Sequence, residues 1–60
     1  MKPKELKRKL ETEGWRVDRI EGSHHMMKHP DRQDLIVIPF HNTDLKPGIL
    51  SKILKQAGLK

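Results

Sequence analysis

The chain has sixty residues and no cysteine, so neither a disulfide nor a cysteine-ligated metal can hold its fold together. A domain of about this size buries only ~60% of the surface that its unfolded chain exposes. A core of that size leaves no room for a deep cofactor cavity or a two-lobed active site. We therefore predict a single domain over residues 1–60, with any chemistry carried out on the surface of a small core.

Glycine and proline divide the chain into five predicted elements. A narrow leucine stripe after one proline predicts a first helix, and a wider aliphatic stripe after another proline predicts a last helix. Between them, alternating or β-branched residues bounded by turn residues predict three strands. The expected elements are a helix over 3–13, strands over 15–20, 24–29 and 35–38, and a helix over 47–58.

The short connections between these strands favour antiparallel pairing. The predicted fold class is α+β, in the order α-β-β-β-α, with two amphipathic helices on one face of a three-stranded antiparallel sheet. Double-stranded-RNA-binding domains share this arrangement. We expect the aliphatic strand over 35–38 to be central and Trp15 to lie in the core. Alternation places Arg19 on the same side of the first strand as Trp15 and Val17.

The charge balance favours a polyanionic partner. Lys and Arg total 13 against 8 Asp and Glu, which gives a formal net charge of +5. A basic excess of this kind is typical of proteins that bind nucleic acid. No apolar run approaches the ~20 residues of a membrane span, and the N-terminus lacks the apolar stretch of a signal peptide. We therefore expect a cytoplasmic protein that does not bind membranes.

Histidine is the enriched side chain with acid–base reactivity, and three of the four histidines fall between His24 and His29. Neither pair of these histidines is expected to share a metal ion, because neighbours on a strand point to opposite faces, and His25 and His29 would lie about 13 Å apart. A metal site built with His41 stays open as an alternative. Free imidazole has a pKa of about 6.5, so both of its protonation states are available near neutral pH. The cluster favours acid–base catalysis over metal binding, although composition alone also fits a solvated polar face.

Several short motifs occur together in a specific order. They are Leu10 through Trp15, Gly22-Ser23-His24-His25, His29-Pro30-Asp31, Val37-Ile38-Pro39-Phe40-His41, and Ile53 through Leu59. In this combination and spacing, the chain resembles the HicA toxins, which are small mRNA interferases of bacterial and archaeal toxin–antitoxin pairs. The resemblance covers essentially the whole chain.

This resemblance implies a double-stranded-RNA-binding-domain-like fold, endoribonuclease activity without a metal or other cofactor, and neutralisation by a HicB-type antitoxin that covers the active histidine. In the family motif that histidine directly follows Gly-Ser or Gly-Gly, which assigns catalysis to His24 and makes His25 its neighbour. The sequence departs from the family at Gly48-Ile49-Leu50, where the family often has Gly-Thr-Leu. The missing hydroxyl weakens the expectation of a helix cap or an RNA contact there.

We expect His24 to act as general acid or base at the 2′-hydroxyl of RNA, with the choice between His24 and His25 left open. Lys28 lies two pleats from His24 and therefore on the same face of the strand. The residues expected to contact RNA are Ser23, His25, Lys28 and Lys52.

Two other functions fit the same sequence. A non-catalytic RNA-binding module would share the fold and the basic surface, and its affinity for RNA would fall steeply with salt. A domain that only binds another protein would show no RNA affinity at moderate salt and no growth arrest on expression. Loss of cleavage on changing His24, with RNA binding retained, would separate the ribonuclease from the binding module.

Overall fold

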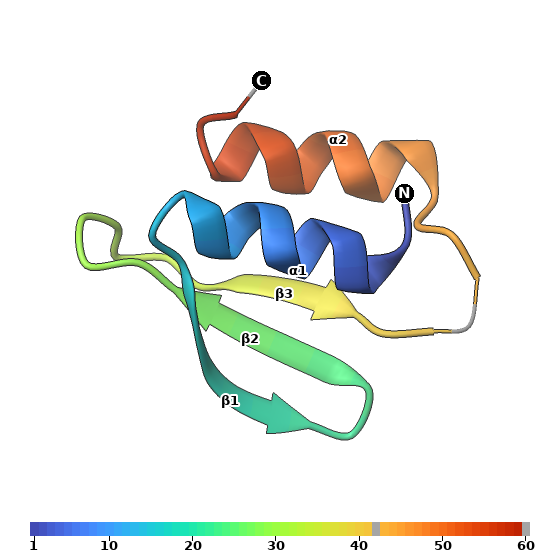
Figure 1. Ribbon diagram of the computed structural model, residues 1–60, viewed down its shortest axis with the longest axis horizontal. Helices are drawn as coiled ribbons and strands as arrows, with labels where there is room; N and C mark the ends of the chain where they lie inside the picture. The colour runs from blue at the N-terminus through green and yellow to red at the C-terminus, as the bar shows by residue number, and fades with distance from the viewer. Residues whose placement is uncertain (42, 60) are drawn as a thin grey trace.

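The computed structural model describes residues 1–41 and 43–59, with the element order α-β-β-β-α (Figure 1). The elements are α1 (Pro3–Thr12), β1 (Arg16–Glu21), β2 (His24–Lys28), β3 (Ile36–Pro39) and α2 (Pro47–Gln56). The predicted α+β class and element order are confirmed, and each boundary lies within two residues of its prediction. Neither helix in this part of the chain has the length and apolarity needed to cross a membrane.

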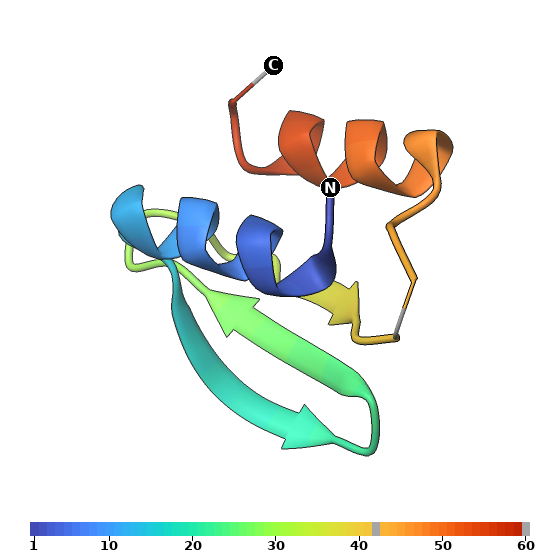
Figure 2. The ribbon, with the colours of Figure 1, turned by 45° about the vertical axis from the view of Figure 1, so that its right-hand side comes forward.

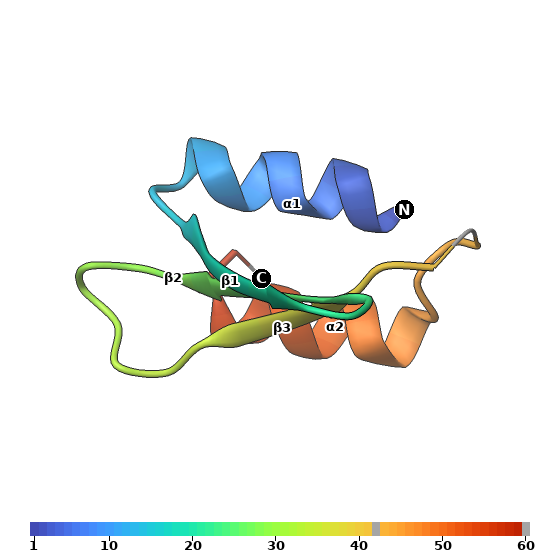
Figure 3. The same ribbon diagram turned by 90° about the horizontal axis from the view of Figure 1, so that it is seen from below.

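The three strands form one antiparallel sheet in the order β1-β2-β3. β2 is therefore central, and the prediction that the aliphatic strand after residue 35 is central is wrong. That strand is aliphatic for a different reason. Ile36 and Ile38 are buried in the core, whereas Val37 between them is exposed. α1 lies over one face of the sheet and α2 runs alongside β3 (Figures 1 and 3).

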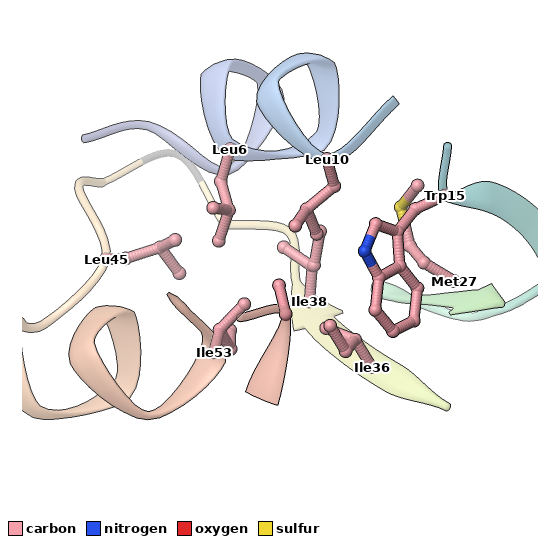
Figure 4. Packing of buried hydrophobic residues seen from close by; sticks show 9 residues of the cluster. Leu6, Leu10, Trp15, Met27, Ile36, Ile38, Leu45 and Ile53 are labelled. Carbon is pink, nitrogen blue, oxygen red and sulfur yellow. The ribbon is translucent and has the colours of Figure 1, made fainter. Parts of the chain in front are cut away.

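The core lies between the two helices and the inner face of the sheet, which is the face turned toward α1. Leu6 and Leu10 of α1 and Ile53 of α2 point toward Ile36 and Ile38 of β3 (Figure 4). The other buried members of this cluster are Trp15, Met27, Leu45 and Ala57. The predicted core position of Trp15 is thus confirmed. Among the described residues no polar side chain is buried, so the fold depends on apolar burial and backbone hydrogen bonds.

His29 joins the end of α1 to the turn that follows β2. Its Nδ1 accepts a hydrogen bond from the Asp31 backbone N–H at 3.0 Å, so in the neutral ring Nε2 carries the proton and donates to the Glu13 carbonyl at 3.0 Å. The ring also packs against Trp15, with centroids 5.2 Å apart. Gly14 lies between Glu13 and Trp15 in the chain, and its φ is +99°, a conformation that L side chains rarely adopt.

We predict that Gly14→Ala destabilises the protein by about 2 kcal/mol or more, because a side chain is strained at this φ and overcrowds the site. An added Cβ would lie 2.8 Å from His29 Nε2, and relieving that contact moves the ring away from Glu13. The free energy of unfolding from urea denaturation measures the loss.

Gly48→Ala is the matched control for this substitution. Gly48 lies in α2 without a positive φ, and an added Cβ there meets nothing within 4 Å. We expect no loss of stability from this change, and a gain of up to about 1 kcal/mol. Equal effects of the two substitutions would contradict the assigned role of the Gly14–His29 contact.

Candidate active site

β2 presents its neighbouring histidines to opposite faces of the sheet. Met27 of β2 is buried, and His25, two residues away, stands opposite the buried Ile38 of β3. His24 and Lys28 therefore point to the outer face, which is the face turned away from α1 (Figure 3). The predictions that the two histidines diverge and that Lys28 shares a face with His24 are confirmed.

His24 stands at the start of β2, directly after the Gly22-Ser23 turn at the tip of the β1–β2 hairpin (Figure 2). Gly22 has φ +59°, as two-residue hairpin turns with glycine in first place require. The Ser23 carbonyl accepts the Phe40 N–H at 2.6 Å, which ties the turn to the chain after β3. The imidazole of His24 is exposed and makes no hydrogen bond or ion pair within residues 1–41 and 43–59. The imidazole of His24 is thus free of side-chain partners, while the backbone of the turn beside it is held in place by the hydrogen bond from Phe40 to Ser23.

His25 is held by packing. Its ring stacks on Phe40, with centroids 3.7 Å apart and an angle of 21° between the planes. The Nδ1 atom is buried and finds no hydrogen-bond partner among the described residues. The side chain is only half-buried, so contact between His25 and RNA remains a prediction. The stacking nevertheless gives His25 a stabilising contact that His24 lacks.

Glu21 is the carboxylate nearest to His24 in the strand register. The two residues face each other across the hairpin, and side chains in this relation have Cβ atoms about 4.5–5.5 Å apart. A carboxylate beside a histidine can accept one ring N–H and leave the other nitrogen free to take a proton. Glu21 is not among the residues predicted from the sequence. The signal was available, because a two-residue hairpin turn pairs the residues that flank it.

A β-bulge in β1 adds a cation to the outer face. The pairing register shifts between Val17 and Arg19, so Arg19 stands opposite Met26 on the outer face. The expectation that Arg19 shares a face with Val17 is therefore wrong. The Nε of Arg19 lies 3.1 Å from Met26 Sδ and 3.6 Å from a Glu21 carboxylate oxygen. Sequence alternation cannot reveal an inserted residue of this kind, and no other signal in the chain marks it.

The remaining predicted RNA contacts are spread over the surface. Ser23 is exposed in the turn beside His24. Lys28 lies at the opposite end of β2, about 13 Å from His24 at the usual rise of a strand. Lys52 lies on α2, in a groove that it lines with Val37 and Ile49. The structure thus brings Ser23 to His24, while Lys28 extends the positive charge along the outer face.

Within the described residues, no three His, Asp or Glu side chains are grouped so that they could hold a metal ion. His29 uses both ring nitrogens in structural hydrogen bonds. His41 is exposed and lines a groove with Pro39 and Lys46. On the outer face, the arrangement therefore offers the free imidazole of His24, the facing carboxylate of Glu21 and nearby cations.

Comparison with known proteins identifies the family of this chain. A family model described as the HicA toxin of bacterial toxin–antitoxin systems matches residues 3–59. No curated protein matches the sequence. The matched region includes both helices, all three strands and the hairpin turn that carries His24. The chain belongs to the HicA family, the toxins of bacterial toxin–antitoxin systems, whose members are paired with an antitoxin.

Proposed function

We propose that this toxin is a cytoplasmic endoribonuclease that cleaves mRNA by acid–base catalysis at His24, without a metal. The proposal rests above all on the free, exposed imidazole of His24 at an anchored hairpin turn. Its supporting features are the facing carboxylate of Glu21 and the cations of the outer face. We further propose that a HicB-type antitoxin neutralises the toxin by covering His24.

In the proposed reaction, the neutral imidazole of His24 takes the proton of a 2′-hydroxyl. The 2′-oxygen then attacks the adjacent phosphorus, and the bond from phosphorus to the 5′-oxygen breaks. The imidazolium or water returns a proton to the leaving oxygen, so the products end in a 2′,3′-cyclic phosphate and a 5′-hydroxyl. Glu21 is the proposed positioning residue, because its carboxylate can hold the second ring N–H. Arg19 and Lys28 offer positive charge to the RNA phosphates.

The direct test is RNA cleavage by the purified protein in the presence of EDTA. We expect His24→Ala to lower the rate by about 100-fold or more, the range for loss of a general acid or base. His41→Ala is the matched control, because His41 is also exposed but lies outside the proposed machinery. Binding of RNA by the His24→Ala protein should persist.

Other outcomes would change the proposal. Cleavage that is lost with His25→Ala and kept with His24→Ala would move the catalytic role to His25. Absence of cleavage by the wild-type protein, with RNA still bound in a salt-dependent way, would favour the non-catalytic RNA-binding module.

A second prediction concerns the salt dependence of RNA binding. If Lys28 contacts a phosphate, RNA binding by the Lys28→Gln protein releases one counterion fewer. The negative slope of log K against log salt should then become less steep by about 0.7 for single-stranded RNA. Filter binding over a range of salt concentrations measures this slope. Lys9→Gln on α1, which lies over the inner face (Figure 3), should leave the slope unchanged. An equal change for both variants would indicate a diffuse charge effect.

A third prediction separates a functional histidine from a structural one. His24→Ala should change the free energy of unfolding by less than ~0.5 kcal/mol, as exposed substitutions usually do. His29→Ala removes two hydrogen bonds and a ring contact with Trp15, so we expect a loss of about 1–3 kcal/mol. Denaturant melts of both variants give the comparison. A loss of ~2 kcal/mol for His24→Ala would make that residue structural and would contradict the catalytic role.

A further inference from the structure

An aliphatic groove between β3 and α2 has no part in the proposed cleavage. Leu35, Val37 and Ile49 remain 37%, 42% and 40% exposed. These three residues line an open groove of about 250 Å³ together with Lys52, Ile53 and Gln56. Clusters of exposed aliphatic side chains mark protein-binding surfaces. A sugar-phosphate backbone has no apolar group of this kind to place against them.

The composition of the groove is not explained by folding. Ile49 lies in the first turn of α2, is 40% exposed and does not belong to the core cluster. An exposed β-branched residue also gains nothing in helix propensity. Val37 similarly points away from the core between two buried isoleucines. Both side chains are therefore available to a partner.

The groove is continuous with the surface around His24. Val37 stands opposite Met26 across β2 and β3, and Met26 contacts Arg19. Two residues further along the same face, His24 of β2 stands opposite Pro39 of β3. A polypeptide segment seated between β3 and α2 would therefore lie beside the histidine and could block access of RNA.

The charges around the groove select an acidic partner. Lys52 lines the groove, and Lys28 and Arg19 point to the same outer face. Lys52 and Lys28 make no ion pair within the described ranges. The whole chain carries a formal net charge of +5. A carboxylate-bearing segment would complement this charge, and an aliphatic side chain on it would fill the groove.

We infer that the antitoxin anchors an acidic segment in this groove, with an aliphatic side chain packed against Leu35, Val37 and Ile49. The inference rests on the proposed function, because anchoring here inhibits the toxin only if the surface beside His24 acts on RNA. The anchoring itself is a binding event, and it can be measured whether or not the chain cleaves RNA.

The test uses the full chain and the purified HicB-type antitoxin of the same genome, with Kd measured by calorimetry. The parent chain and each of its variants carry His24→Ala so that they can be produced without toxicity, and the antitoxin is unchanged. We expect Ile49→Glu to weaken antitoxin binding by at least ~10-fold, as for a central interface side chain. Ile20→Glu is the matched control, because Ile20 is 55% exposed on β1, and it should change Kd less than ~3-fold. Ile49→Thr, a milder change, provides a second variant if Ile49→Glu does not fold.

Four results would overturn the inference. Unchanged antitoxin affinity of both Ile49 variants would exclude the groove as the anchor. If the Ile49 variants lose RNA affinity by the same factor as antitoxin affinity, the groove binds RNA. If they lose a self-association that the parent protein shows in sedimentation, the groove binds a second copy of this chain. An antitoxin affinity that does not fall with rising salt would exclude the acidic segment. Because these readouts are binding constants, a wild-type protein that fails to cleave RNA would contradict the proposed function alone.

Discussion

The alternation of side chains along β2 determines both how this molecule holds together and where it can act. Met27 enters the core from one face of the strand, while His24 and Lys28 point outward from the other. A shift of the pairing by one residue would expose Met27 and turn His24 and Lys28 toward the core. Burial of Met27 therefore fixes the exposure of His24. The glycine turn before His24 and the hydrogen bond from Phe40 to Ser23 hold the hairpin in this register.

The small core leaves the outer face of the sheet open, and we propose that the toxin acts on this surface. The buried side chains of the described residues are all apolar, and they lie toward α1 and α2. Chemistry on such a face has no enclosing pocket, so it depends on a rigid backbone and on charges supplied by neighbouring strands. The bulge in β1 brings Arg19 to this face beside Glu21. An open face is also easily covered, which suits a toxin that an antitoxin must neutralise.

The element order, the core position of Trp15 and the divergence of His24 from His25 could be predicted, because they follow from helical and strand periodicity and from glycine and proline. The position of β3 at the edge could not, since an aliphatic strand beside a helix resembles a central one in sequence. The outward turn of Arg19 depends on a bulge that has no sequence signal. The stacking of His25 on Phe40 joins segments that only the fold brings together. Local patterns thus predicted the elements, while tertiary packing decided their neighbours.

In the proposed mechanism, the free imidazole of His24 activates the 2′-hydroxyl of the RNA, and this hydroxyl attacks the neighbouring phosphate. The most direct measurement is the chemical nature of the RNA ends, determined by mass spectrometry of the products of a defined oligonucleotide. Attack by the 2′-oxygen predicts a 2′,3′-cyclic phosphate on one fragment and a 5′-hydroxyl on the other, with no cut at a position that carries a 2′-deoxy sugar. Products that end in a 3′-hydroxyl and a 5′-phosphate, or cleavage at the deoxy position, would contradict the account.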